Sequence, residues 1–144
     1  MQYMFLLYST PESEPTYGTP EFQAMMADFA AFSEKAKTDG VFCGGEGLQG
    51  IETATSLRVR GGKVETMDGP FAETREHLGG YYVLDVPDLD TAMRYAAQIP
   101  VAAFGTVEVR PLLNYDPANT YPPARTCPPP HRPSRFSRRW RPSY

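Results

Sequence analysis

The sequence has few of the residues that build metal and redox sites. Its 144 residues include 2 cysteines, Cys43 and Cys127, and 2 histidines, His77 and His131. The cysteines show no CxxC spacing and the histidines are not clustered, so the usual ligand sets of zinc sites are absent. We therefore expect no metal site and, since no cofactor-binding motif is visible, no cofactor.

A long hydrophobic run is also missing. No apolar stretch reaches the roughly 18 residues that a helix needs to cross a bilayer. The segment 1–8 has no basic region and no small-residue cleavage site, so it predicts a strand and not a signal peptide. We expect a cytoplasmic protein that does not associate with a membrane.

The glycines near position 45 lack the spacing of a phosphate-binding loop. The segment Gly44-Gly45-Glu46-Gly47 matches neither GxGxxG nor a Walker motif. We expect a bulge or a close approach of two backbones at this point instead.

Positive charge is scarce in the first part of the chain and abundant in the last. Residues 1–113 carry 8 Lys and Arg against 16 Asp and Glu, whereas residues 114–144 carry 6 Arg and 1 Asp. Nucleic acid binding needs clustered cations, so it is not expected of the acidic part. The composition indicates a domain at 1–113 and a Pro/Arg-rich tail at 114–144 that we expect to be disordered. The tail is either solvated without a partner or, as a weaker hypothesis, bound to nucleic acid.

Hydrophobic patterns in the first part predict alternating strand and helix. Residues 2–8 predict a strand that is apolar on both faces. Thr19 and Pro20 are signals for the start of a helix and Gly40 for its end, and apolar side chains recur at helical spacing between them. Residues 41–43 begin a second strand.

The rest of the domain predicts a hairpin, two further strands and a second helix. The expected elements are a hairpin at 55–66 that turns at Gly61-Gly62, a short helical stretch at 72–78, a strand at 81–86, a helix from 87 to before 100 and a strand at 106–113. This order predicts an α+β fold, with a ferredoxin-like antiparallel sheet, helices on one face and the hairpin as an insertion.

The first strand needs a cover on both faces, but the helices cover only one face of a single sheet. Face-to-face packing of two sheets would supply the second cover, so we expect a homodimer. In the last strand, Val107 and Val109 point to the helices, and Glu108 and Arg110 point to the opposite face. These two charged side chains are either an ion pair or a clamp for a ligand.

The turn Asp68-Gly69-Pro70-Phe71 is the most distinctive local feature. Asp bonds nearby backbone, Gly adopts unusual dihedral angles and Pro fixes φ, so the segment predicts a tight turn. Asp68 is therefore either a turn-forming residue or a general base, which would need a substrate within about 2.6–3.2 Å. His77 is either a second acid–base residue or a histidine with a structural role.

Side chains near the turn are candidates for binding a small molecule. Glu73 and Arg75 belong either to a pocket or to surface ion pairs. Phe71, Tyr81 and Tyr82 are expected in the core or in a cavity wall, where a phenol could orient a ligand. The candidate catalytic residues are Asp68 and His77, and the candidate substrate-binding residues are Phe71, Glu73, Arg75, Tyr81, Glu108 and Arg110.

A longer string around the turn resembles a known family. Residues 68–82, DGPFAETREHLGGYY, resemble the DGPF-type branch of the YCII-related proteins, and Glu108-Val109-Arg110-Pro111 resembles the end of the same domain. The resemblance covers about residues 1–113 and none of the tail. It implies a dimeric α+β barrel and an activity that is generally unassigned.

The resemblance also implies two functional contexts. Related YCII-type proteins include a dehydrochlorinase that acts on a chlorinated aromatic compound, with a His–Asp pair proposed for acid–base work. That histidine lies on the first helix, and this chain has no histidine before His77, so the pair has no counterpart here. Several DGPF-type proteins are encoded beside extracytoplasmic-function sigma factors, which implies regulation.

Two functions stay open on the sequence. One is a cofactor-independent lyase or isomerase that moves a proton in the cavity of a dimer. The other is a non-catalytic ligand-binding or regulatory module, either on its own or in association with an extracytoplasmic-function sigma factor. Turnover that is lost in Asp68→Asn while the fold is retained would indicate the first; a melting shift with a ligand but no turnover would indicate the second.

Overall fold

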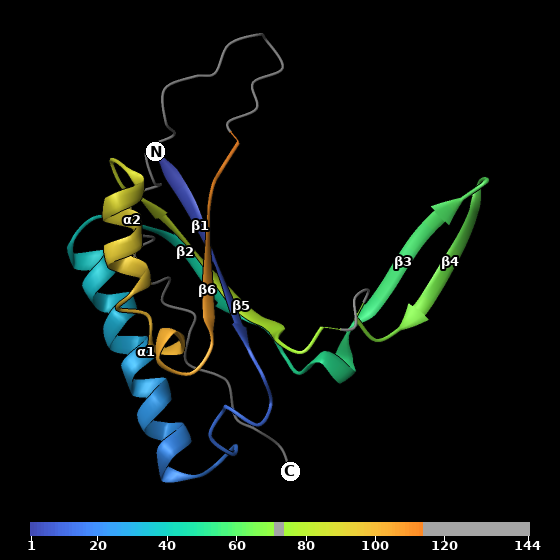
Figure 1. Ribbon diagram of the computed structural model, residues 1–144, viewed down its shortest axis with the longest axis horizontal. Coiled ribbons are helices and arrows are strands. Elements are labelled where there is room, and N and C mark those ends of the chain that lie inside the picture. The colour runs from blue at the N-terminus through green and yellow to red at the C-terminus, as the bar shows by residue number, and fades with distance from the viewer. Residues whose placement is uncertain (71–73, 114–144) are drawn as a thin grey trace, which may run out of the picture.

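The computed structural model describes residues 1–70 and 74–113, which form a sheet covered by helices and a hairpin that projects from it (Figure 1). The strands are β1 (Gln2–Ser9), β2 (Phe42–Gly47), β3 (Thr55–Arg60), β4 (Lys63–Asp68), β5 (His77–Asp85) and β6 (Thr106–Pro111). The helices are α1 (Pro20–Thr38) and α2 (Leu89–Ala96), with short 3-10 turns η1 (Ile51–Thr53) and η2 (Pro100–Ala103).

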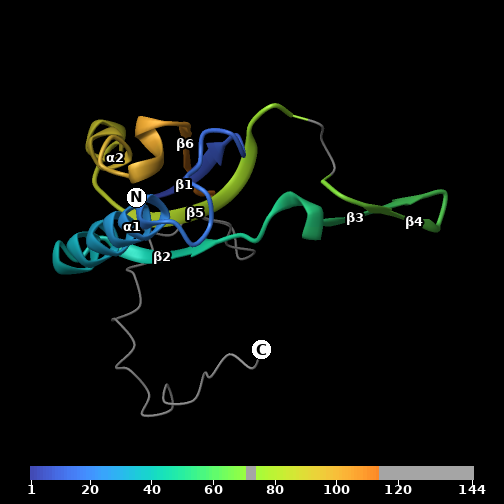
Figure 2. The same ribbon diagram turned by 90° about the horizontal axis from the view of Figure 1, so that it is seen from below.

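The main sheet has four strands in the order β2-β5-β1-β6, and all neighbours are antiparallel. The first strand therefore lies inside the sheet, paired with β5 on one side and β6 on the other. Both helices lie on the same side of the sheet (Figures 1 and 2). This arrangement confirms the predicted α+β class and is compatible with a ferredoxin-like fold.

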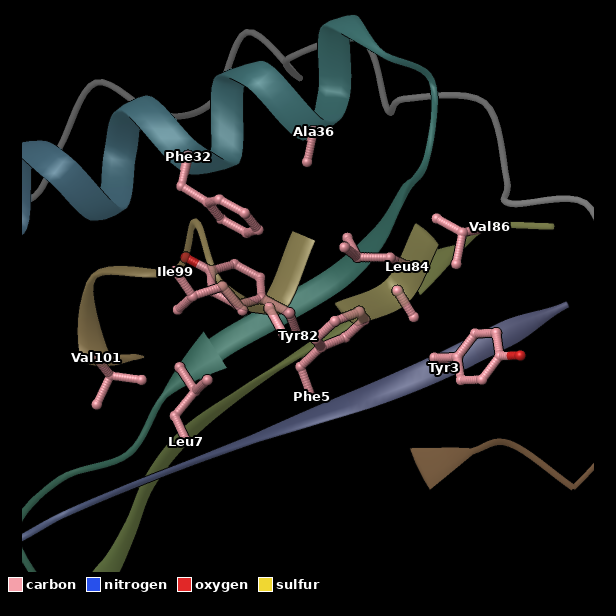
Figure 3. Close-up of a cluster of buried hydrophobic side chains, with 12 residues drawn as sticks. Tyr3, Phe5, Leu7, Phe32, Ala36, Tyr82, Leu84, Val86, Ile99 and Val101 are labelled. Carbon is pink, nitrogen blue, oxygen red and sulfur yellow. The ribbon is translucent and has the colours of Figure 1, made fainter. Parts of the chain in front are cut away.

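The core lies between the helices and one face of the sheet. Every second residue of β1 is buried, and the same alternation occurs in β5. Phe32 and Ala36 of α1 face these strands (Figure 3), and Ala92 and Ala96 of α2 belong to the same buried cluster. The fully buried large side chains are Phe5, Leu84, Val86 and Ile99.

The other face of the sheet, named the open face here, is partly exposed. In β1 it carries Met4, Leu6 and Tyr8, and their neighbours in β5 include Tyr81 and Val83. These five side chains are half-buried, although the helices lie on the opposite side. The prediction that β1 is apolar on both faces is thus confirmed, and one of these faces has no second layer in the described part of the chain.

The predicted start and end of α1 are confirmed. The hydroxyl of Thr19 accepts a hydrogen bond from the backbone N–H of Phe22 at 3.3 Å, and Pro20 occupies the first helical position. Gly40 follows the helix with a φ of 73°, a value that favours glycine. In the described residues, no helix combines the length and apolar character that a bilayer crossing requires.

The predicted hairpin is confirmed as well. Gly61 and Gly62 have φ values of 55° and 74°, as a type I′ turn requires, and the second strand extends to Asp68, two residues beyond the prediction. The glycine-rich stretch of β2 contains the expected irregularity, a register shift between Phe42 and Gly44.

The short helix predicted at 72–78 is wrong for the residues that can be compared. Residues 74–76 are irregular, and His77 and Leu78 already belong to β5. The pairing of His77 with Ser9 and of Leu78 with Tyr8 accounts for this, because ladder bonds to β1 override a weak local helical pattern. Residues 72 and 73 and the predicted tail lie outside the described residues, and the last strand ends at Pro111 instead of 113.

Candidate functional site

A cavity lies between α1 and the sheet, at the side where β2 and β5 pair. It has a volume of about 590 Å³ and is walled mainly by apolar side chains, among them Phe22, Met25 and Phe29 of α1 and Phe104 after η2. Small-molecule sites commonly measure about 300–1,000 Å³. We name it the α1 cavity.

The local sequence explains why α1 presents an apolar wall there. Phe22, Met25 and Phe29 stand at helical spacing and share one face. Further along the same helix, Phe32 and Ala36 are buried in the core, whereas Phe22, Met25 and Phe29 are only half-buried. The first half of α1 therefore covers a hollow, and the second half covers the packed core.

The opposite wall is built from backbone and one phenol ring. A Cβ added at Gly45 would overlap Cδ1 of the Tyr82 ring and would lie 2.9 Å from Cε1. A Cβ added at Gly80 would lie 2.9 Å from the carbonyl oxygen of Glu46. Glycine thus allows β2 and β5 to approach closely, and the ring of Tyr82 fixes the position of the wall.

Tyr82 carries a polar group into this apolar region. Its hydroxyl lies 3.1 Å from Oγ of Ser33, and Ser33 donates its own hydroxyl proton to the carbonyl of Phe29 at 2.9 Å. Because a serine has one hydroxyl proton, Tyr82 must be the donor in the bond to Ser33. The phenol oxygen is left with acceptor capacity only.

A second polar group stands at the other side of the cavity. The hydroxyl of Ser9, which is 5% exposed, donates a hydrogen bond to Oε1 of Glu14. Both residues line the α1 cavity, and Glu14 itself is exposed. The bond holds a carboxylate at the cavity mouth, so this polar group too is an acceptor.

A separate groove lies at the end of the sheet where the hairpin begins. Tyr8, Arg75 and Glu108 line it together, and its volume is about 740 Å³. A neighbouring hollow of about 460 Å³ is lined by Tyr8, Pro70 and His77. The groove is more polar than the α1 cavity and the neighbouring hollow is smaller. Both are lined by residues that the sequence predicted as candidate site residues.

Glu12, in the loop after β1, interacts electrostatically with residues that line the groove and the neighbouring hollow. The pKa of the Glu12 carboxyl is lowered, first by a hydrogen bond from its own backbone amide, then by the hydroxyl of Thr10 and by electrostatic interaction with Arg75 and His77. Arg75 and His77 therefore lie near a carboxylate that the sequence did not single out.

The structure brings together only some of the predicted site residues. Arg75 and Glu108 share a groove, and Glu108 also forms an ion pair with Arg110. Asp68 is the last residue of β4, is exposed and lines none of the cavities described above. Tyr81 lines the α1 cavity, although its side chain is half-buried on the open face beside Leu6, and Phe71 and Glu73 lie outside the described residues.

Sequence reasoning missed Ser9, Glu14 and Ser33. The helical spacing of Ser33 with Phe29 and Phe22 was a usable signal, because it places the hydroxyl on the apolar side of α1. No sequence signal pairs Ser33 with Tyr82, which lies 49 positions away. Among residues 1–70 and 74–113, no three His, Cys, Asp or Glu side chains are grouped so that they could hold a metal ion.

Comparisons with known proteins agree with this architecture. Residues 1–116 match the YCII-related domain. An uncharacterised protein of Rhizobium meliloti (strain 1021) is 34% identical over 119 residues, which cover 81% of this chain and 96% of that protein. The match extends over the helices, the sheet and the projecting hairpin. The chain therefore belongs to the family of proteins with a YCII-related domain.

Proposed function

We propose that this YCII-related protein is a ligand-binding module that takes a small, largely apolar molecule into the α1 cavity. The observation that carries the proposal is the combination of an apolar wall with two fixed hydrogen-bond acceptors, the phenol oxygen of Tyr82 and the carboxylate of Glu14. Pockets of this kind bind through apolar contact and gain orientation from a few polar groups.

The acceptors define the chemistry of the ligand. The buried phenol oxygen of Tyr82 is satisfied by a donor, and the exposed carboxylate of Glu14 favours a positively charged one. The ligand would thus have an apolar body with an amine or another N–H or O–H donor. An anionic ligand would meet the Glu14 carboxylate and the acidic surroundings, since residues 1–113 carry 16 Asp and Glu against 8 Lys and Arg.

A matched pair of probes tests the proposal. 2-Naphthylmethylamine and 2-naphthylacetate share a ring system and differ in charge, and isothermal titration calorimetry measures their Kd. We expect the amine to bind at least about tenfold more tightly, which corresponds to roughly 1.4 kcal/mol. Glu14→Gln should reduce this preference without unfolding the protein.

Two substitutions on α1 locate the binding site. Ala30 lines the α1 cavity, so Ala30→Trp should fill it and abolish binding of the amine. Ala27 is exposed on the same helix and lines none of the cavities described above, so the Ala27→Trp variant should bind the amine with the Kd of the wild type. Equal binding of the amine and the acetate, or binding that survives Ala30→Trp, would contradict the proposal.

The second candidate function is a cofactor-independent lyase or isomerase on the open face. The groove that joins Tyr8, Arg75 and Glu108 favours it, because an anionic intermediate could be held by Arg75. It is the weaker candidate, since Asp68 is exposed at the end of β4 and lines none of the cavities found among the described residues. Turnover of any aromatic or lactone substrate that disappears in Asp68→Asn would favour the enzyme.

Two finer assignments accompany the proposal. The string DGPFAETREHLGGYY at 68–82 supports placing the chain in the DGPF-type branch of the family. The half-exposed apolar side chains of the open face support a homodimer in which a second copy covers that face, as in the dimeric α+β barrel that the resemblance implies.

A further inference from the structure

The hairpin of β3 and β4, named the arm here, projects from the body of the protein (Figures 1 and 2). Its strands pair with each other as a separate two-stranded sheet. The arm is closed at its base by a bond from Gly69 N–H to the carbonyl of Ala54 at 2.7 Å and by one from Ser56 Oγ to the carbonyl of Gly69 at 2.8 Å. All residues of β4 are exposed, and β3 is exposed except for Ser56.

The arm is amphipathic. Its register places Leu57, Val59 and Val64 on one face, where they are 62%, 61% and 62% exposed. The other face carries an ion pair of Arg58 and Glu65, with Nε to Oε2 at 2.6 Å, and the cations Arg60 and Lys63 beside the turn. An isolated two-stranded hairpin is marginally stable in water, and an apolar face of this kind is stabilised when something covers it.

The charges of the arm and of the rest of the domain indicate which surface covers the arm. Residues 1–113 contain 8 Lys and Arg and 16 Asp and Glu. The arm at 55–68 holds 3 of these basic residues and 2 of these acidic residues, so the arm is cationic and the rest of the domain is strongly acidic. Arg60 and Lys63 form no ion pair within the described part of the chain. An arm with these charges is attracted to the acidic body of a second copy and repelled by the tip of a second arm.

The open face matches the arm in both polarity and charge. Across the four strands, one row of this face consists of Glu46, Tyr81, Leu6 and Glu108, since Tyr81 pairs with Glu46 and Leu6, and Leu6 pairs with Glu108. The row has an apolar centre and a carboxylate at each edge, of which Glu108 also pairs with Arg110. The arm has an apolar face, and its cations Arg60 and Lys63 stand on long, flexible side chains on the other face, beside the turn.

We infer that the arm is a clasp between two copies of this chain, in which the apolar face of each arm packs on the open face of the other copy at its Tyr8 end. Each strand of the arm has 6 residues, or about 20 Å, which is long enough to extend across the Tyr8 end of the open face, while the partner's sheet covers the rest of that face. The groove lined by Tyr8, Arg75 and Glu108 then gains a wall of Leu57, Val59 and Val64 from the partner copy. This site is complete only in the dimer.

Substitutions on the two faces of the arm test the clasp. The variant Leu57→Thr/Val59→Thr/Val64→Thr keeps strand-forming side chains and removes the apolar contact. We expect sedimentation analysis of the full chain to give a dimer whose Kd rises at least about tenfold in this variant. The control Arg58→Thr/Glu65→Thr alters the opposite face without changing net charge, and its Kd should stay near that of the wild type. A monomeric wild type, or equal Kd values in the two variants, would overturn the clasp.

Cross-linking identifies the surface that receives the arm. The chain has 3 lysines, Lys35, Lys37 and Lys63, and only Lys63 lies on the arm. A mixture of ¹⁴N- and ¹⁵N-labelled protein treated with a carbodiimide should give mixed-label peptides that join Lys63 to Glu46 or Glu108. Mixed-label peptides that join Lys63 to Glu65 instead would show contact between arms and overturn the inference, as would the absence of any link from Lys63 between chains.

Discussion

At the scale of single residues, the spacing of β2 and β5 depends on glycine. Gly45 pairs with Tyr82, and a Cβ at Gly45 would lie 2.9 Å from the ring carbon Cε1 and 3.0 Å from the carbonyl oxygen of Tyr81. Tyr82 is 8% exposed and packs edge-on against Phe32, with ring centroids 5.0 Å apart. The ring can move away from a new methyl group only by disturbing this contact and the bond to Ser33.

Gly45→Ala should therefore destabilise the protein. We expect the free energy of unfolding to fall by about 1–3 kcal/mol, as overpacking of a core does. Gly44→Ala is the matched control, because a Cβ there has nothing within 4 Å. Its effect should be neutral or slightly stabilising, by less than about 1 kcal/mol. Urea denaturation followed by circular dichroism measures both values, and equal values would mean that β2 moves outward at little cost.

The same residues show how far the sequence predicts the candidate site. The string at 68–82 resembles a known family and predicts a turn, and Gly69 has a positive φ of 100°, which favours glycine. The string does not predict that Asp68 lines none of the cavities described above, because the direction of a hairpin relative to a sheet is set by contacts distant in sequence. The bond between Ser33 and Tyr82 is missed for the same reason.

At the scale of elements, the end of α1 is tied to α2. Asp39, which caps α1, accepts a bond from Lys35 at 2.6 Å and one from the hydroxyl of Tyr95 in α2 at 2.8 Å. The bond from Lys35, followed by that from Tyr95, lowers the pKa of the Asp39 carboxyl. Burial, followed by the bond to Asp39, raises the pKa of Tyr95. The tie therefore uses an ionised Asp39 and a protonated Tyr95.

The pH dependence of this tie follows from the direction of each shift. The ordinary pKa of an aspartate carboxyl is 3.8, and that of Asp39 is lowered. Asp39 therefore stabilises the fold fully at pH values above 3.8, and this contribution is lost as the pH falls below 3.8. Asp39→Asn should lower the melting temperature near neutral pH, and its difference from the wild type should close as the pH falls below 3.8. The phenol contribution is lost at the other extreme, above pH 10.0.

A second carboxylate on α1 serves as the control for Asp39. Asp28 is exposed on the same helix and forms no ion pair among the described residues. Asp28→Asn should give a difference in melting temperature that changes little with pH. If the melting temperature of Asp39→Asn stays below that of the wild type by a constant amount down to about pH 2, Asp39 does not act through its ionised carboxylate.

Local signals predicted most elements because each carries its own start and end residues. Thr19, Pro20 and Gly40 delimit α1, and Gly61-Gly62 fixes the register of the hairpin. The helix at 72–78 was wrong because its only support was local composition, whereas His77 and Leu78 gain ladder bonds to β1. The sequence predicted the hairpin as an insertion, but its projection from the body is a tertiary feature with no local signal.

At the scale of the whole molecule, residues 1–70 and 74–113 cover the sheet on one face only. Leu6 lies in the middle of the open face, between Tyr81 and Glu108. It is half-buried in the single chain, whereas its neighbours in sequence, Phe5 and Leu7, are buried at 0% and 7% exposure. A second copy of the chain would bury Leu6 as well, so association should respond to this side chain more strongly than folding does.

Leu6→Lys tests this expectation. The ammonium would stand opposite Glu108, which favours the ladder between β1 and β6 and retains the monomer fold. In the dimer the same charge would be desolvated between two sheets, so the Kd should rise by at least about a hundredfold. Ala31→Lys, on the exposed side of α1, should leave the Kd unchanged. Because a dimer is stabilised by mass action, the melting temperature of the wild type should rise with protein concentration and that of Leu6→Lys should not. Wild-type melting that is independent of concentration would show that the open face stays exposed in solution.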